Sequence, residues 1–376
     1  MIYLDHAATT PMRPGVWDAM APFASERFGN SSGLHDFSRR AKNALEEARE
    51  QIAGLVGASP MEIVFTSGGT ESDNLAIKGT VWNGSSRNGV VTIASEHEAI
   101  LETVHMLGRF GSPVRIIGVD REGRIELDEL LESLDPATAV VSAMVVNNET
   151  GVIHDLPLIA KAVKDRDPGV LVHTDAVQAF SSEHLDVDRL GVDLMTITGH
   201  KFGGPKGAGL LYVREGTRLE PLIHGGGQEL GRRSGTHDVA GAVGLAEAMR
   251  QAAADRDRFT REVGAIRDRF ANRLSAIDGL VRNTPAEDVS SHHLNVRIPG
   301  VSNETLLVRL DRAGVAASAG SACQSGAAEV SHVLESMGLS ASEARESLRF
   351  SFGWNSSVEE ADEAAATLVD LVGELR

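Results

Sequence analysis

The sequence is poor in cysteine and in long apolar runs, and each absence excludes a class of protein. Cys323 is the single cysteine among 376 residues, so an intrachain disulfide framework is excluded. The N-terminus lacks the basic, apolar and small-residue order of a signal peptide. The longest apolar runs, such as Ala139–Val146, are far shorter than the roughly 20 residues that a membrane helix needs. We therefore expect a cytoplasmic protein with no membrane partner.

Positive charge is also in deficit. Lys and Arg number 36 against 53 Asp and Glu, which gives a formal net charge of −17. A surface for nucleic acid or anionic lipid needs the opposite balance, so we expect no direct nucleic-acid partner. Any anion-binding site must then be local, built from backbone N–H groups and a few placed cations.

Short β-rich runs alternate with helix-period segments between about residues 38 and 250, which is typical of a parallel sheet covered by helices. The clearest helix is predicted at 38–57, and Gly57 suits its end. A run at 209–213 follows Lys201 too closely for a parallel return, so it should pair antiparallel. A long helical stretch at 241–277 predicts the bridge to a second domain. The other candidate strands are 62–66, 90–94, 114–118, 139–146, 170–174 and 193–198.

Polar residues recur at the downstream ends of these strands. Ligands of open α/β sheets bind outside the carboxyl ends of the strands, so these residues predict one cleft. They are Ser67–Thr70, Glu96–His97, Asn147–Glu149, Asp175 with Gln178, and His200–Lys201.

Three of these features together suggest a cofactor. The glycines of Thr66–Asn74 precede a helix and could hold a phosphate, although a plain glycine turn with a capping hydroxyl fits the run equally well. Lys201 could form a Schiff base or be an ordinary surface lysine. Asp175 could pair with a protonated ring nitrogen or cap a helix. A Schiff-base lysine, an acid for a pyridinium and a phosphate cradle are the three requirements of pyridoxal phosphate.

Other motifs carry less weight. His97 follows a strand and could cover a cofactor ring or move protons, although a lone histidine is more often a satisfied polar residue. No histidine spacing makes a convincing metal site, so we expect no catalytic metal. Gly29–Gly33 matches the GxSxG motif of serine hydrolases, but the polar segment 24–28 is not the buried strand that this motif requires.

The ordered blocks of the chain resemble the NifS/IscS-type cysteine desulfurases, which belong to the class V aminotransferase family of pyridoxal-phosphate enzymes. The similarity extends through nearly the whole sequence. The blocks are Tyr3–Pro11, Gly29–His35, Thr66–Gly79, Asn147–Gly151, His173–Gln178, Gly199–Gly207, His224–Glu229, Arg233–Thr236, Gly320–Cys323 and Ser347–Ser351.

This resemblance implies an α/β fold of the aspartate-aminotransferase-like type, fold type I of the pyridoxal-phosphate-dependent transferases. A mostly parallel seven-stranded sheet would form a large cofactor-binding domain at 13–255. Residues 1–12 and 256–376 would form a smaller α+β domain that carries the segment around Cys323.

The resemblance also implies roles for single residues. Lys201 would hold the cofactor as a Schiff base and later move the α-proton of the substrate, and His97 would stack on the ring as an acid–base group. Asn148 and Arg349 would hold the substrate, with Arg349 as a fork for its carboxylate. The cofactor would be bound by Asp175 at the pyridine nitrogen, Gln178 at the ring hydroxyl, Asn148, and Gly69, Thr70, Thr198 and His200 around the phosphate.

A homodimer is implied as well, because Thr236 would reach the phosphate of the neighbouring protomer, with Arg233 close by. Three positions depart from the family pattern. Thr198 stands where serine is common, and Thr150 and Phe352 replace aliphatic residues.

Cys323 lies in a run of small residues at 318–326, whereas a core cysteine would have large apolar neighbours. Few side-chain contacts are typical of a functional loop. By the resemblance, Cys323 takes the sulfur of L-cysteine as a persulfide, releases L-alanine and passes the sulfur to an acceptor or scaffold protein. The sulfur would then serve iron–sulfur cluster assembly, tRNA thiolation, thiamin or molybdopterin assembly, or DNA phosphorothioation, and the sequence does not choose among these uses.

Several alternatives stay open. A selenocysteine lyase or another fold-type-I aminotransferase would keep Lys201 and Asp175 with less need of Cys323. A sulfurtransferase without cofactor would need only the thiol, and a scaffold protein would need neither group.

Overall fold

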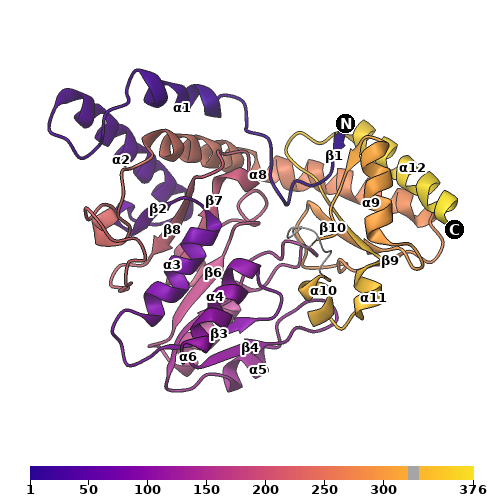
Figure 1. Ribbon diagram of the computed structural model, residues 1–376, viewed down its shortest axis with the longest axis horizontal. Coiled ribbons are helices and arrows are strands. Elements are labelled where there is room, and N and C mark those ends of the chain that lie inside the picture. The colour runs from indigo at the N-terminus through magenta and orange to yellow at the C-terminus, as the bar shows by residue number, and fades with distance from the viewer. Residues whose placement is uncertain (321–329) are drawn as a thin grey trace.

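The structure, a computed structural model, describes residues 1–320 and 330–376 (Figure 1). Its centre is a seven-stranded sheet with the strand order β2-β8-β7-β6-β5-β3-β4. The strands are β2 (Ile63–Thr66), β3 (Gly89–Ile93), β4 (Val114–Ile117), β5 (Thr138–Ser142), β6 (Leu171–Asp175), β7 (Leu194–Thr198) and β8 (Gly209–Val213). Five neighbouring strands, β7, β6, β5, β3 and β4, run parallel, and β8 is antiparallel to both β7 and β2. The mostly parallel sheet and the antiparallel run at 209–213 are therefore confirmed.

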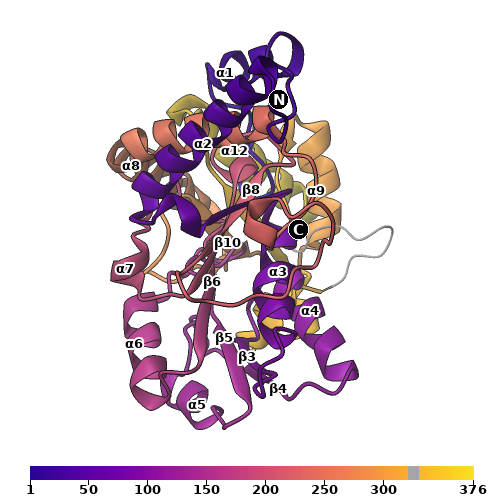
Figure 2. The same cartoon turned by 90° about the vertical axis from the view of Figure 1, so that its left-hand side faces the viewer.

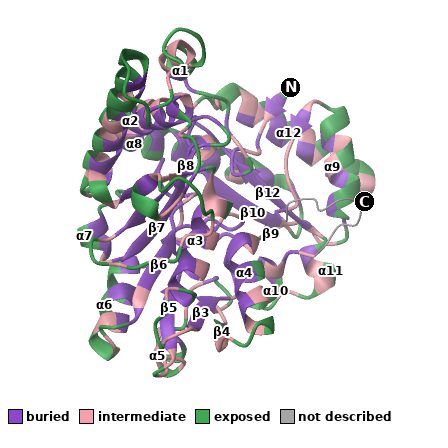
Figure 3. Cartoon of the chain, turned by 60° about the vertical axis from the view of Figure 1, so that its left-hand side comes forward, coloured by how far each residue is buried: buried purple, intermediate pink, exposed green. Residues whose placement is uncertain are grey.

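Helices cover both faces of this sheet, which explains why β3, β5, β7 and β8 are buried along their whole length (Figure 3). The helices α3 (Gly69–Val81) and α4 (Glu98–Arg109) pack on one face. The opposite face is covered by α1 (Val16–Ser25), α2 (Asp36–Val56), α5 (Leu127–Glu132), α6 (Leu156–Arg166), α7 (Val187–Leu190) and α8 (Val239–Arg273), as Figure 2 shows for α6, α7 and α8.

Local chemistry explains most differences between predicted and observed bounds. The helix expected at 38–57 begins at Asp36, because the His35 side chain accepts the Ser38 N–H as an N-cap, and Gly57 ends it with a φ of 72°. The strand expected at 139–146 ends at Ser142. The next residues still donate from Ala143 and Val145 to carbonyls of β6, but Val146 turns to form a bridge with Ile153.

A second core lies beside the first. It contains the antiparallel sheet β12-β10-β9 and the parallel pair β1-β11, covered by α9 (Asn303–Arg312), α12 (Val358–Leu375) and the second half of α8. The short helices α10 (His332–Ser336) and α11 (Ala341–Ala344) adjoin it. The strands are β1 (Ile2–Tyr3), β9 (Val281–Arg282), β10 (His293–Arg297), β11 (Val315–Ala316) and β12 (Ser347–Ser351).

The helix α8 belongs to both cores. Its buried apolar residues as far as Ala252 pack in the first core, and those from Phe259 onward pack in the second. The domain bounds at 13–255, and at 1–12 with 256–376, stay a prediction, which this change of core along α8 supports. Among the described residues, no helix is long and apolar enough to span a membrane.

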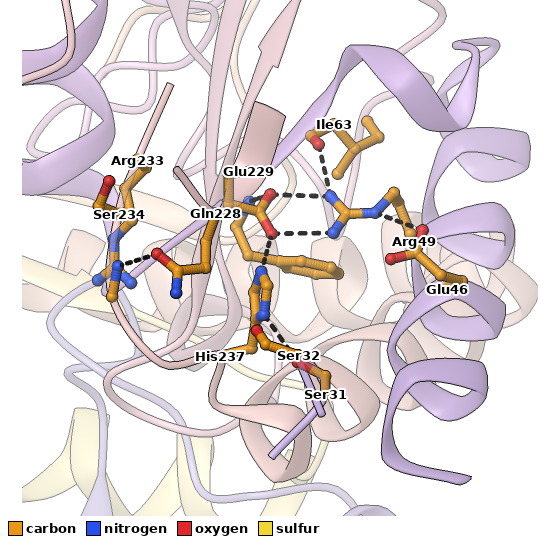
Figure 4. Close-up of polar contacts among 12 residues, drawn as sticks. Ser31, Ser32, Glu46, Arg49, Ile63, Gln228, Glu229, Arg233, Ser234 and His237 are labelled. Atoms are coloured by element: carbon orange, nitrogen blue, oxygen red, sulfur yellow. Dashed lines mark hydrogen bonds and ion pairs between the residues drawn. The ribbon is translucent and has the colours of Figure 1, made fainter. Parts of the chain in front are cut away.

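The segment from Ile223 to Asp238 is fastened to α2 and β2 through one buried carboxylate. Glu229 accepts hydrogen bonds from Arg49 Nη1 and Nη2 at 2.8 and 2.9 Å and from the Phe65 backbone at 2.9 Å (Figure 4). Glu229 and its neighbour Leu230 both adopt left-handed backbone angles, with φ of 49° and 58°. The ion pair therefore holds a strained turn in place.

The same carboxylate contacts His237, whose other ring nitrogen faces Ser31 of the GxSxG motif. The distances are 2.8 Å from His237 Nε2 to Glu229 and 2.9 Å from His237 Nδ1 to Ser31 Oγ (Figure 4). Ser31 lies in the loop between α1 and α2, and the element directly before it is the helix α1 and not a strand. Because Glu229 is already neutralised by Arg49, we interpret this set as structural, and the nucleophile elbow remains disfavoured.

Replacing the buried carboxylate tests this anchor. Glu229→Gln should lower the free energy of unfolding by about 3 kcal/mol, because it leaves the Arg49 charge buried without its main partner. Glu46→Gln is the matched control. Glu46 contacts the same guanidinium at 3.0 Å but is 44% exposed, so its loss should cost less than about 1 kcal/mol. Urea unfolding of both variants measures the difference, and equal costs would contradict the anchor.

The pH dependence of this anchor has a definite sign. Burial alone would raise the pKa of Glu229, but the hydrogen bonds from Arg49 and His237 lower it to about 2. The stabilisation is complete above the unfolded-state pKa of about 4.3 and is lost as the pH falls towards 2. The gap in stability between the wild type and Glu229→Gln should therefore narrow over this range.

Candidate active site

A cavity of about 540 Å³ lies where the carboxyl ends of the parallel strands meet the second core. This volume is in the range of small-molecule and cofactor sites. The predicted residues that line it are Gly69, Thr70, His97, Asn148, Asp175, Gln178, Thr198, His200, Lys201 and Arg349. A larger surface depression of about 1100 Å³ between α8 and residues 356–358 contains none of the predicted residues.

The other two predicted residues are Thr236 and Cys323. Thr236 is exposed on the segment that Glu229 anchors. Cys323 lies outside the described residues, although Ser318, Ala319 and Gly320 before it and His332 after it line the cavity. The role of Thr236 towards a neighbouring protomer and the role of Cys323 as nucleophile both stay predictions.

Lys201 ends the short turn Gly199–Lys201 that follows β7. Its Nζ donates to the carbonyl oxygens of Ala7 at 2.6 Å and Ala8 at 3.0 Å. Burial, assisted by the charge of Arg349, lowers the pKa of Lys201 to about 8. A lysine with this pKa is partly unprotonated near neutral pH, as attack on an aldehyde requires.

Asp175 ends β6, and Gln178 follows it in the next turn. The Asp175 Oδ1 accepts the Val177 N–H at 2.8 Å, and Gln178 Nε2 donates to the Ala7 carbonyl at 2.9 Å. Burial raises the pKa of Asp175 to about 6, and the Val177 N–H and the Lys201 charge oppose this rise. Asp175 can therefore carry a negative charge at neutral pH in a buried place where water does not screen it.

The beginning of α3 offers an anion site. Gly68, with φ of 147° and ψ of −175°, occupies a backbone region open to glycine, and no side chain caps the helix. The first N–H groups of α3 are then available to a ligand, and the helix dipole favours a negative charge there. Thr70, Thr198 and His200 line the cavity with Gly69. Burial, followed by the charges of Lys201 and Lys206, lowers the pKa of His200 to about 4, so its imidazole is neutral.

His97 caps the start of α4 by accepting the Ala99 N–H at Nδ1, at 3.1 Å. Its Nε2 therefore carries the hydrogen. Burial, followed by the charges of Lys201, His332 and Arg349, lowers its pKa to about 4. His97 thus presents a neutral ring to the cavity, which suits stacking on a flat cofactor.

Arg349 is held by groups that the sequence alone did not bring together. Its Nη1 donates to the carbonyls of Asn148 at 2.9 Å and Gly320 at 3.3 Å, and its Nη2 donates to Asp5 Oδ1 at 2.7 Å. Its Nε is buried without a partner among the described residues. The guanidinium is therefore oriented in advance, with Asp5 occupying part of the fork that would receive a substrate carboxylate.

Sequence reasoning missed Asp5 and Asp73 as cavity residues, whereas Glu149 belongs to the predicted strand end Asn147–Glu149. Asp5 and Asp73 belong to blocks that carry the family resemblance, which was the one signal available for them. Glu149 is buried and accepts from Ser331 Oγ at 2.5 Å. This contact joins positions 182 residues apart, so no local pattern could reveal it.

The residues in this cavity fit pyridoxal phosphate. A partly unprotonated amine, an acid that can be charged, a neutral aromatic imidazole and a helix N-terminus with two threonine hydroxyls surround one space. These are the groups that an aldehyde, a pyridine nitrogen, a ring face and a phosphate require.

Comparison with known proteins agrees with this chemistry. The family model "Aminotransferase class-V" matches residues 2–363. The chain is 41% identical to "Cysteine desulfurase IscS" of Dictyoglomus turgidum over 100% of its own length and 95% of that protein. The solved structure of a "NIFS-like protein" has a TM-score of 0.94, 34% identity and 99% coverage of both chains. The structure "SspA in complex with cysteine" has a TM-score of 0.83 and 35% identity, covering 94% of this chain and 99% of that one.

The Asp5–Arg349 contact yields a prediction about ligand affinity. Asp5→Asn removes a negative charge beside the guanidinium, so a small α-amino acid should bind about fivefold more tightly, equivalent to about 1 kcal/mol. Asp128→Asn, on an exposed position of α5 outside the cavity lining, should leave the affinity unchanged. Isothermal titration measures both, and weaker binding in Asp5→Asn would mean that Asp5 serves the ligand and does not compete with it.

Proposed function

The chain belongs to the class-V aminotransferase family, and from this membership we propose that it takes sulfur from L-cysteine through Cys323. The protein is a cysteine desulfurase that depends on pyridoxal phosphate. The observation that carries this conclusion is the cavity in which Lys201, Asp175 and Arg349 face the same space, in a chain matched over its whole length by cysteine desulfurases.

When bound, pyridoxal phosphate supplies an electron sink that weakens the bonds at the α-carbon of an attached amino acid. The Lys201 amine would join the cofactor aldehyde, and Asp175 would pair with the ring nitrogen. Gln178 would bind the ring hydroxyl, and His97 would cover the ring face. The N-terminus of α3 would hold the phosphate together with Thr70, Thr198 and His200.

The residues of the chain then share the remaining work. Arg349 binds the carboxylate of L-cysteine, and Asn148, whose Oδ1 is buried without a partner among the described residues, faces the same substrate. Lys201, with its pKa near 8, accepts and returns the proton at the α-carbon. Its seat on the carbonyls of Ala7 and Ala8 keeps the amine pointed into the cavity.

Cys323 completes the reaction. Its thiolate attacks the substrate sulfur, a sulfur–sulfur bond forms, and the bond from that sulfur to the β-carbon breaks. The electron pair stays with the carbon, which takes up a proton. L-Cysteine and one thiol thus become L-alanine and one persulfide, with no external oxidant or reductant. A protein acceptor or scaffold then receives the persulfide sulfur.

The finer parts of the proposal concern assembly and location. A homodimer would let the exposed Thr236 reach the phosphate of the neighbouring site, with Arg233 held by Glu71 at 2.8 Å nearby. A cytoplasmic location also remains part of the proposal. Selenocysteine lyase activity is the rival function, and it differs in not needing Cys323 for turnover.

Two substitutions test the function together. Cys323→Ser should lower alanine and sulfide release by more than about a thousandfold, because the nucleophile is gone, and should leave the yellow colour of the bound cofactor intact. In the wild type, borohydride should reduce the Schiff base and link the cofactor covalently to the chain. In Lys201→Ala this covalent label should be absent. Lys206→Ala, an exposed lysine five residues further on, is the control and should keep it. Normal desulfuration by Cys323→Ser would refute the role of the thiol.

A further inference from the structure

The cavity has a group of buried acids that the proposed function uses only in part. We call Asp73, Glu96 and Asp175 the acid cluster. Asp73 in α3 is 1% exposed, Glu96 after β3 is fully buried, and Asp175 ends β6. Asp73 and Asp175 both line the cavity. Burial penalises the ionised form of each carboxyl group, and repulsion from Asp175 adds to this penalty at Asp73 and Glu96, so we do not expect all three to be charged together.

The surroundings of Asp73 offer no opposite charge. The nearest basic side chain is His173 in β6, whose Nε2 lies 3.7 Å from Asp73 Oδ1. Both nitrogens of His173 already face hydroxyls, Ser142 Oγ at 2.9 Å and Thr196 Oγ1 at 3.1 Å. Burial lowers the pKa of His173 to about 3, so its ring is neutral. Asp73 Oδ1 has no hydrogen-bond partner in the described part of the chain.

Asp175 is better placed to hold a charge than the other two acids. It accepts the Val177 N–H, and the charge of Lys201 after β7 favours its ionised form. Burial, followed by the charge of Asp175, raises the pKa values of Asp73 and Glu96 well above the ordinary range. The titratable groups that face Asp73 are therefore Asp175, His173 and Glu96, and none of them is a cation near neutral pH.

We propose that Asp73 is a positioning residue that keeps its proton near neutral pH, so that Asp175 is the charged member of the acid cluster when the cofactor binds. Asp73 touches no reacting atom in this role. It shares the buried space with Asp175 and takes the proton that one of the two must carry. The effect of the Asp175 charge on the cofactor nitrogen rests on the proposed function. The protonation of Asp73 does not, because it can be measured on the protein without cofactor.

The first test uses the protein without cofactor. A folded chain that retains a proton on Asp73, which the unfolded chain releases near pH 4, loses stability as the pH rises until Asp73 ionises. Asp73→Asn cannot show this loss. The unfolding equilibrium constant of the wild type should therefore rise, relative to the variant, by up to about tenfold for each pH unit above about 4. Asp18→Asn, on an exposed position of α1, is the control and should follow the wild type.

The second test examines the coupling to Asp175. Asp175→Asn removes the neighbouring charge, so Asp73 should ionise at a lower pH and the loss of stability should end earlier. Asp73→Asn should bind pyridoxal phosphate at pH 7 within about twofold of the wild type, because it replaces an uncharged group. Tighter binding by more than about tenfold would mean that the proton sits on Asp175, and the proposal would be wrong. If Asp73 had a merely structural role, Asp73→Asn would keep the pH slope of the wild type, and Asp175→Asn would not change the pH at which the loss of stability ends.

If Asp73→Asn does not fold, infrared spectroscopy of the wild type labelled with 13C-aspartate decides the question. A carboxylic-acid band at pH 7 that persists in Asp175→Asn supports the protonated Asp73. A band that is absent, or that disappears in Asp175→Asn, overturns the proposal. The two proposals fail separately. A wild type that binds no pyridoxal phosphate refutes the function, whereas an unchanged pH slope in Asp73→Asn refutes the protonation.

Discussion

The amine of Lys201 rests on the backbone carbonyls of Ala7 and Ala8, and its charge acts on Asp175, His97 and His200 around the same cavity. A carboxylate in the place of these carbonyls would raise the pKa of the lysine. Carbonyl oxygens orient the amine without fixing its charge, so burial keeps the pKa near 8. Asp175 is then left free, at the end of the neighbouring strand, for a ligand.

The chain deals with buried charge in two different ways. Arg49 with Glu229 and Arg349 with Asp5 are close ion pairs in which each partner compensates the desolvation of the other. Asp73 and Glu96 have no such partner among the described residues, and their raised pKa values favour the neutral form. The two ion pairs connect segments that are distant in sequence. The acids without an ion-pair partner lie near the ligand cavity, where a proton can move between neighbouring carboxyl groups.

Much of the architecture could be predicted from the sequence, because strand length and connection length restrict the topology. The short connection between Lys201 and β8 excluded a parallel return, and the polar strand ends met at one edge as parallel strands require. The predicted C-terminal end of β5 was wrong, because the apolar residues 143–146 are as deeply buried as the strand although they lie outside it. Asp5 and the carbonyls that hold Lys201 come from the first residues of the chain. Only packing across about 190 residues places them in the site.

The helix α8 runs through both cores and connects them. A continuous helix of 35 residues is about 50 Å long, and bending it would break backbone hydrogen bonds in its middle. Lys201 follows β7 of the first core and Arg349 lies in β12 of the second, so α8 connects the two parts of the chain that supply them. An amino acid bound between these two side chains would therefore contact both cores at once.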